Sequence, residues 1–270
     1  MSIRIKSNHN RKNSPIMPKD IRCMIVGTSG CGKTSLLSQM LLEEGLLDYE
    51  KLIICCPMIE QDSYKFVIDG FSSGCGKAIL SHLVSLSQEQ PFDVDHLEQF
   101  FVNFRVLKQY VAENKDIDDE TKDLVKFVPE VITFDQIDLV PQLHDWSKED
   151  KKLIVFDDVL EENQKIIEPY FTKARHKNFD TIYLAQNYCK TPRQCIRTNL
   201  NMLILFNLNS DDSNRIFRDH VYPDMTKEQF NTICEKGWSE PFGYIVIDKT
   251  RLPMEGKYRL NLKTWVTECV

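Results

Sequence analysis

Residues 27–34 have the types and spacing of a phosphate-binding loop. The string GTSGCGKT fits G-x-x-x-x-G-K-[ST] and lies between an apolar stretch and a predicted helix. Its three glycines let the backbone curl so that successive N–H groups face one anion, and the following helix adds its dipole. The pattern predicts a Walker A site for ATP, with cofactor-binding residues Gly27, Thr28, Ser29, Gly30, Cys31, Gly32, Lys33, Thr34 and Ser35.

Two side chains of this loop have expected chemical roles. Lys33 is expected to reach the β and γ phosphates, and the Thr34 hydroxyl is expected to take one position on Mg²⁺. A similar string, SGCGK, recurs at 73–77, but Phe71 and Ala78 stand where the motif needs glycine and threonine. We therefore predict a loop and a helix start at 73–77, and no second nucleotide site.

A second motif supplies carboxylates. LIVFDD at 153–158 has the form of a Walker B strand, in which an apolar strand ends in acidic residues. Asp157 is expected to hold magnesium through water, and Asp158 to orient the attacking water. Apolar strands that end in acids are common, so this interpretation depends on the Walker A loop in the same chain. Together the two motifs predict ATP and Mg²⁺ as cofactors.

The predicted elements indicate how these residues are positioned. Continuously apolar strands alternate with helices at 35–47, from 160 to about 178, near 211–219 and near 226–236. Such strands are typical of a mostly parallel sheet with helices on both faces, so we expect an α/β fold of the RecA-like P-loop NTPase type. The predicted strands are 21–27, 51–57, 151–159, 180–188, 201–208, 242–248 and 257–262, with another possible at 128–134.

The domain organisation follows from composition. Residues 1–20 are polar and basic and predict a flexible N-terminal tail, whereas 21–270 predict a single P-loop ATPase domain. An insertion at about 58–150, with helices expected at 78–86 and 96–111, is not assigned a role. Neither a signal-peptide core nor an apolar run of membrane-spanning length is present, so neither secretion nor membrane insertion is expected. The nine cysteines include no CxxC pair and predict reduced thiols in a cytosol-like compartment.

The charge distribution limits where DNA can bind. The net charge of −6 and the pI of about 5.6 imply that any DNA contact is local. Residues 110–150 carry twelve acidic side chains against four Lys or Arg, whereas 171–200 carry six Lys or Arg against one acid. Phosphate contacts need only positive charge at reachable spacing, although such runs can also be solvated faces. The candidate DNA contacts are Lys190, Arg193 and Arg197.

Three classes of P-loop enzyme compete for this pattern. A GTPase requires N-K-x-D, but in NKDID at 114–118 Ile117 replaces the aspartate, and no glycine lies three residues after Asp157 or Asp158. Nucleotide kinases usually place the second acidic motif nearer and have an arginine-rich lid, whereas about 120 residues separate the motifs here. The third class is the oligomeric motor ATPases, whose sensor residue ends the strand after Walker B.

The sequence resembles one family of such motors. IVFDDV at 154–159 and the block FTKARHKNFDTIYLAQNYCKTPRQCIRTNLNMLILF at 171–206 are similar to the packaging ATPases of the FtsK–HerA group. These occur in large DNA viruses, virophages and Maverick or Polinton elements. The shared features are an arginine–histidine pair, a strand ending in L-x-Q, a proline-opened helix and a strand ending in L-I-L-F. The resemblance covers roughly 21–57 and 150–265, including YIVID and RLN near the end, and leaves 58–150 unmatched.

The resemblance implies roles for two further residues. Gln186 would be the sensor and Arg175 a trans-acting arginine finger. Without the resemblance, Gln186 could simply cap a strand end, and Arg175 could compensate a helix dipole. The Walker B strand ends in Asp157-Asp158, whereas many relatives end in Asp-Glu, and the shorter second carboxylate holds its water differently.

The resemblance also implies a function. It is ATP-driven translocation of double-stranded DNA into a preformed capsid by a homo-oligomeric ring, a pentamer or hexamer. The implied partners are DNA, other copies of the chain, and capsid or portal-vertex proteins, at virion assembly sites in the host cytoplasm or nucleus. Two alternatives stay open: a cellular DNA pump of the same group, and a P-loop switch or scaffold that hydrolyses little ATP.

Overall fold

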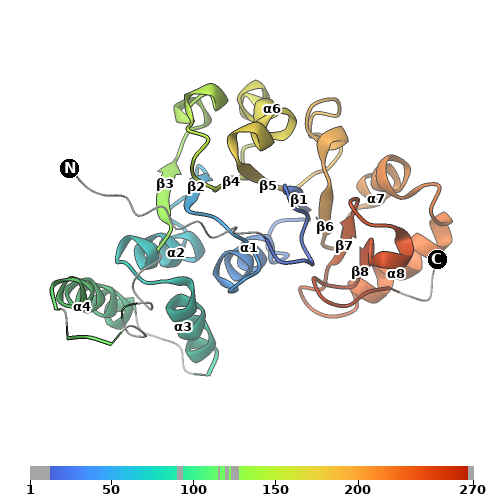
Figure 1. Cartoon of the computed structure of the whole chain (residues 1–270). Helices are drawn as coiled ribbons and strands as arrows, with labels where there is room; N and C mark the ends of the chain where they lie inside the picture. The colour runs from blue at the N-terminus through green and yellow to red at the C-terminus, as the bar shows by residue number, and fades with distance from the viewer. Residues whose placement is uncertain (1–12, 90–93, 115, 119–121, 123–127, 267–270) are drawn as a thin grey trace.

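An eight-stranded sheet forms the centre of the protein (Figure 1). The computed structural model describes residues 13–89, 94–114, 116–118, 122 and 128–266. The strand order is β3-β2-β4-β5-β1-β6-β7-β8. The strands are β1 (Arg22–Val26), β2 (Lys51–Cys55), β3 (Glu130–Phe134), β4 (Lys152–Asp157), β5 (Phe179–Ala185), β6 (Met202–Leu205), β7 (Ile245–Asp248) and β8 (Tyr258–Arg259).

The sheet is mostly parallel, which confirms the predicted fold class. The strands from β3 to β6 pair in parallel, and only β7 and β8 run antiparallel to their neighbours. The possible strand at 128–134 is confirmed as β3. It pairs with β2 at one edge of the sheet, so the insertion at 58–150 contributes a strand to the central sheet.

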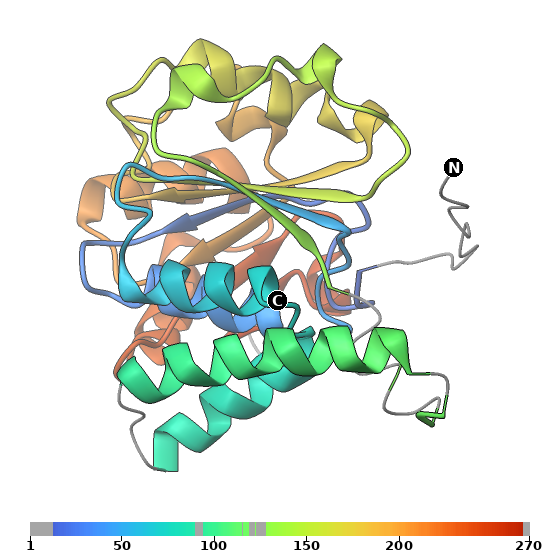
Figure 2. The ribbon, with the colours of Figure 1, turned by 90° about the vertical axis from the view of Figure 1, so that its left-hand side faces the viewer.

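Helices cover both faces of the sheet. Figures 1 and 2 show α1 and α2 against one face with α4 outside them, whereas α6 lies on the opposite face. The last helices of the chain, α7 and α8, lie near the end of the sheet formed by β6, β7 and β8. The helices are α1 (Lys33–Leu42), α2 (Asp62–Ser72), α3 (Lys77–Glu89), α4 (Val94–Glu113), α6 (Gln164–Thr172), α7 (Ser210–Ile216), the π-helix η5 (Phe217–Val221) and α8 (Lys227–Gly237). Short 3-10 helices are η1 (Ile137–Leu139), η2 (Leu143–Asp145), η3 (Ala174–Lys177), η4 (Arg197–Asn199) and η6 (Pro253–Glu255).

The strand side chains divide between two hydrophobic cores. In β1, Cys23 and Ile25 face the core that α1 covers, whereas Met24 and Val26 face the core that α6 covers. Successive side chains of a strand point to opposite faces, so a strand buried on both faces is largely apolar, and its few polar residues, such as Asp180 and Thr181 in β5, are hydrogen-bonded. This explains the continuously apolar strands.

Three segments show how the local predictions compare with the structure. The 73–77 string is a loop and a helix start as predicted, since α3 begins at Lys77. The predicted helix at 35–47 ends earlier, at Leu42, because Glu43 is extended and Gly45 has a φ of +72°. The helix expected after Thr191 is instead a series of turns followed by η4.

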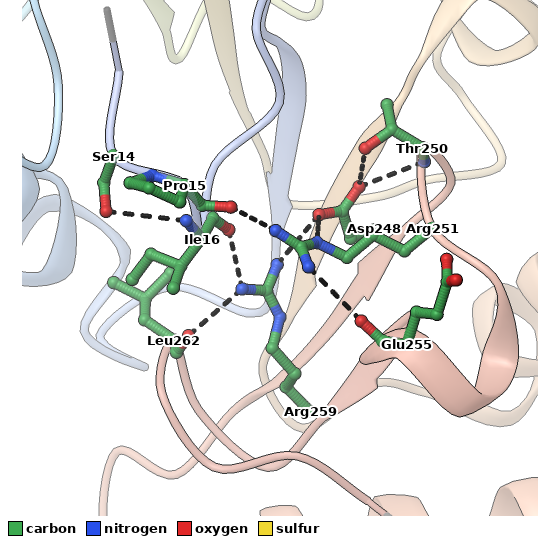
Figure 3. Close-up of polar contacts among 9 residues, drawn as sticks. All are labelled: Ser14, Pro15, Ile16, Asp248, Thr250, Arg251, Glu255, Arg259 and Leu262. Carbon is green, nitrogen blue, oxygen red and sulfur yellow. Dashed lines mark hydrogen bonds and ion pairs between the residues drawn. The ribbon is translucent and has the colours of Figure 1, made fainter.

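Residues 13–20 of the predicted tail pack against the domain, and residues 1–12 lie outside the described residues. Met17 is buried in the core, and Asn13 donates a hydrogen bond of 2.8 Å to Asp180. Figure 3 shows the backbone carbonyls of Pro15 and Ile16 accepting hydrogen bonds from Arg251 and Arg259. This segment is therefore fastened to the last strands of the sheet.

A buried ion pair holds this junction. Asp248 and Arg259 are 0% and 1% exposed, and Asp248 Oδ2 lies 3.3 Å from Arg259 Nη2 (Figure 3). The same carboxylate accepts a bond of 3.0 Å from Arg251 Nε, while Arg259 Nη1 donates to the carbonyls of Ile16 and Leu262. Burial lowers the pKa of Arg259, and the charge of Asp248 opposes that shift. The two buried charges therefore depend on each other.

Among the described residues, no helix combines the length and apolar character that a bilayer crossing requires.

We expect Asp248→Asn to destabilise the protein by about 3 kcal/mol, because it leaves the buried Arg259 charge uncompensated. The measurement is the urea midpoint of unfolding. Glu43→Gln is the matched control, since it makes the same change in the exposed pair with Lys263 (2.9 Å) and should leave the midpoint nearly unchanged. Equal midpoints for the two variants would contradict this account.

Candidate nucleotide site

The glycine-rich loop connects β1 to α1. Gly30 and Gly32 have φ values of +75° and +101°, in the left-handed region that favours glycine. A Cβ atom on Gly27 would lie 2.6 Å from Cys31 Sγ and 2.7 Å from Phe206 Cβ. The three glycines of the motif are therefore required by conformation or by close approach, and α1 begins directly after Gly32.

The Lys33 side chain folds back onto this loop. Its Nζ donates to the carbonyls of Gly27 and Thr28 at 2.8 and 2.9 Å, and the residue is only 9% exposed. One positive charge is thereby fixed inside the loop, where an anion bound by the loop would meet it.

The loop forms one wall of a cavity of about 750 Å³. The opposite wall comes from the ends of β4 and β5, so the cavity brings together residues that are far apart in the chain. Its lining includes Ser29, Gly30, Gly32, Lys33, Thr34, Ser35, Ser63, Asp157, Asp158, Gln186, Lys190 and Phe242.

The strand order explains why the sensor residue reaches the acidic pair. β5 lies between β1 and β4, and Asp157 pairs in register with Leu184, two residues before Gln186. Gln186 Nε2 donates a hydrogen bond of 3.1 Å to Asp158 Oδ1. Asp158 has a φ of +54°, a conformation that aspartate tolerates better than most residues. The predicted sensor and the second Walker B carboxylate are thus in direct contact.

Asp157 has a partner that the sequence did not indicate. The Tyr64 hydroxyl donates a hydrogen bond of 2.7 Å to Asp157 Oδ2, and both side chains are buried. Burial raises the pKa of Asp157, while the bond from Tyr64 and the charge of Lys33 act in the opposite direction. Tyr64 belongs to α2, where it shares a buried face with Val67 and Phe71. That spacing is typical of any core-facing helix, so it carried no sign of the site.

The oxygen donors around Asp157 fit magnesium. Nowhere in the described residues do three or more His, Cys, Asp or Glu side chains form a metal cluster. Asp157 and the Thr34 hydroxyl line the same cavity, however. Mg²⁺ is usually held by one or two carboxylates together with substrate phosphates and water, and these residues suit that mode.

Arg175 lies away from its own cavity. It is exposed in η3, directly before β5. The pKa of Arg22, at the start of β1, is lowered mainly by burial and further by the positive charge of Arg175. The seven residues of β5 then lead to the end of the strand that faces the cavity, a distance of roughly 20 Å at about 3.3 Å per residue. Arg175 therefore lies at the amino end of β5, whereas Gln186 directly follows its carboxyl end.

The three candidate DNA contacts differ in exposure. Lys190 and Arg193 are exposed, and Lys190 forms an ion pair of 3.3 Å with Glu161. Arg197 is 5% exposed, with its guanidinium 4.8 Å from the Tyr188 ring centre and 3.7 Å from Asp219. The prediction that Arg197 contacts DNA is therefore wrong in this structure, because its side chain is inside the protein.

The ends of the parallel strands bring a glycine-rich loop, a buried lysine and an acidic pair to one cavity. This combination defines a P-loop NTPase. Residues 109–234 of the chain match the family model described as Poxvirus A32 protein. The match contains the Walker B strand, Arg175 and Gln186. This match confirms the resemblance to the ATPases of large DNA viruses, which was based on residues 154–159 and 171–206.

Several solved structures are similar to this chain at low identity. The genome packaging NTPase B204 from Sulfolobus turreted icosahedral virus 2, in complex with AMPPCP, is 11% identical over 87% of this chain and 95% of that chain, with a TM-score of 0.48. The DNA-packaging ATPase B204 from Sulfolobus turreted icosahedral virus is 12% identical over 86% and 94%, with a TM-score of 0.46. VirB4 of Thermoanaerobacter pseudethanolicus is 10% identical over 78% and 83%, with a TM-score of 0.43. A sequence search of curated proteins found no match.

We expect Tyr64→Phe to raise the Mg²⁺ concentration for half-maximal ATP hydrolysis about tenfold. A hydrogen bond to a charged group contributes about 1.5–3 kcal/mol, and without it Asp157 is less firmly held in its ionised form. Tyr49→Phe is the matched control, since it removes another buried phenol whose bond, 2.7 Å to the Leu41 carbonyl, is structural. An equal change in the Mg²⁺ requirement of both variants would show that Tyr64 acts only through stability.

Proposed function

We propose that this chain is an ATP-driven motor that moves double-stranded DNA into a preformed capsid. The observation that carries the proposal is the contact between Gln186 and Asp158 beside Lys33, in a chain whose residues 109–234 match a poxvirus family. This contact links the strand that senses the nucleotide to the carboxylate that would act on water.

Each residue of the cavity has a distinct part in hydrolysis. Lys33 leaves the carbonyls of Gly27 and Thr28 and neutralises the β and γ phosphates as negative charge develops. Asp158 accepts a hydrogen bond from the attacking water, and Gln186 holds that carboxylate in place. Magnesium, bound by Asp157 and Thr34 together with the phosphates, would stabilise the charge on the transferring group.

The segment after Gln186 provides a route from chemistry to DNA. Gln186 and Lys190 line the same cavity, and Arg193 is exposed three residues further on. A change in the hydrogen bonding of Gln186 on hydrolysis would therefore act directly on a backbone segment that carries two exposed basic residues. Such residues bind phosphates without reading sequence.

The position of Arg175 supports a ring. Because it is exposed and lies outside the lining of its own cavity, its guanidinium is accessible to the cavity of a neighbouring copy, where it would stabilise phosphate charge. A closed ring of five or six chains gives every cavity such a neighbour. The ring would act with capsid or portal-vertex proteins at virion assembly sites in infected cells.

We expect Lys33→Ala and Asp157→Asn each to reduce ATP hydrolysis about a thousandfold or more. The first removes the phosphate counter-charge, and the second weakens magnesium binding while leaving the backbone loop intact. The measurement is steady-state ATP turnover with and without duplex DNA, which should stimulate the wild-type chain.

The matched control for Lys33 is Lys77→Ala, which alters the lysine of the second SGCGK string. Lys77 Nζ donates to the Leu47 carbonyl at 2.7 Å, and turnover should persist without it. If folded Lys33→Ala hydrolysed ATP at the wild-type rate, the proposed site would be wrong. Wild-type turnover that duplex DNA leaves unchanged would favour a switch or scaffold.

We expect Arg175→Ala to bind ATP and to assemble, but to lose hydrolysis, because each cavity would lack its neighbour's arginine. Lys173→Ala, an exposed charge change in the same segment, should stay active. The measurement is ATP turnover beside particle size by light scattering. An assembled, DNA-bound Arg175→Ala ring with wild-type turnover would rule out the finger role.

We expect DNA binding to weaken steeply with salt and to be indifferent to sequence. Replacing Lys190 and Arg193 with glutamine should reduce the slope of log K against log salt by about 1–2, because each phosphate contact contributes about 0.9. Lys65→Gln with Lys263→Gln, which neutralises two exposed lysines elsewhere, is the control. If both double variants kept the wild-type slope, the DNA track would lie on another surface.

A further inference from the structure

Phe242 presents an aromatic ring at the nucleotide cavity. It lies in the loop between α8 and β7, is 69% exposed, and is part of the cavity lining. Its Cδ1 atom lies 3.1 Å from the position that a Cβ on Gly32 would occupy, so the ring sits against the glycine that precedes Lys33. A single exposed aromatic residue is ordinary, but this one stands at the end of the phosphate-binding loop.

The loop holds this ring in an unfavourable backbone conformation. Phe242 has a φ of +60°, which is rare for a bulky residue and persists only where the surroundings enforce it. Trp238 Nε1 donates to the Leu205 carbonyl at 2.8 Å, which ties the start of the loop to β6. A Cβ on Gly243 would lie 2.3 Å from the Gly237 carbonyl oxygen, so the two ends of the loop are in close contact. The loop is thus tied to β6 and closed on itself beside Phe242.

The sheet order fixes which end of a nucleotide would meet Phe242. Measured from β1, the strands β5 and β4 lie on one side and carry Gln186 and the acidic pair. On the other side lie β6 and β7, and β7 starts at the carboxyl end of β6, where Ile245 pairs with Leu205. A terminal phosphate directed toward the acidic pair leaves the nucleoside extending toward the β6–β7 side. Phe242, three residues before β7, is on that side.

We propose that Phe242 is the platform on which the base of the bound nucleotide stacks. The inference rests on the proposed nucleotide site and adds its base-binding part. A flat ring that lines the cavity and is largely exposed can stack on a purine, and stacking covers apolar surface that is otherwise in water. Every base has a π face, so the platform increases affinity for nucleotides without selecting one base.

The test compares ATP with inorganic tripolyphosphate, which carries the phosphates but no base. Calorimetric titration of the full chain should show that Phe242→Ala weakens ATP binding about tenfold, as expected for losing one base–aromatic stack. Binding of tripolyphosphate should be unchanged. GTP should lose the same factor as ATP, and Phe242→Tyr should restore both. Tyr222→Ala removes an equally exposed aromatic residue, 70% exposed and outside the cavity lining, and should leave ATP binding unaltered.

A second variant separates stacking from backbone strain. Phe242→Asn accommodates a positive φ more readily than alanine, yet it also lacks the ring and should lose the same factor. Equal losses for ATP and tripolyphosphate, or no loss for ATP, would overturn the platform while the nucleotide site stands. A wild-type chain that binds neither ligand would instead overturn the nucleotide site itself, and the platform with it.

Discussion

The parallel register of β1, β5 and β4 is the constraint on which the site depends. The carboxyl ends of these three parallel strands lie side by side, so residues from positions 27–34, 157–158 and 186 meet at one cavity. Because β5 lies between the other two strands, the Gln186 amide meets Asp158 beside the loop that holds Lys33. A sheet of this kind is buried on both faces, and its strands are therefore largely apolar. The chemistry is confined to the strand ends for the same reason.

The electrostatics of the site extend beyond the two Walker motifs. Asp157 is buried, which disfavours its charge, and both Tyr64 and Lys33 counteract that effect. Tyr64 comes from α2, so the segment between β2 and β4 takes part in the nucleotide site as well as in the sheet through β3. On the other side of β1, Phe242 packs against Gly32 of the glycine-rich loop. The cavity is thus lined by residues from both sides of the three central strands: Ser63 at the start of α2 on one side, and Phe242 in the loop before β7 on the other.

The parts of this architecture that could be predicted from the sequence are those with local signals. The glycine pattern, the acidic strand end and the apolar strands depend on a few consecutive residues, and the structure has a strand in each predicted place. The bond from Tyr64 to Asp157 joins residues 93 positions apart, and nothing near Tyr64 distinguishes it from an ordinary core tyrosine. Arg197 had the charge of a DNA contact, but its burial against Tyr188 and Asp219 depends on tertiary packing. Phe242 lay at the start of a predicted strand, and its place against Gly32 follows only from the antiparallel pairing of β6 and β7.

We propose that hydrolysis at this cavity moves the chain along duplex DNA. Displacement of a fluorescent third strand from a triplex at the end of a long duplex measures this movement. We expect the wild-type chain to displace the strand with ATP and Mg²⁺, with a lag that grows with the length of the duplex. Replacing ATP with AMPPCP should abolish the displacement. Rapid ATP hydrolysis by DNA-bound protein that never displaces the third strand would contradict the account.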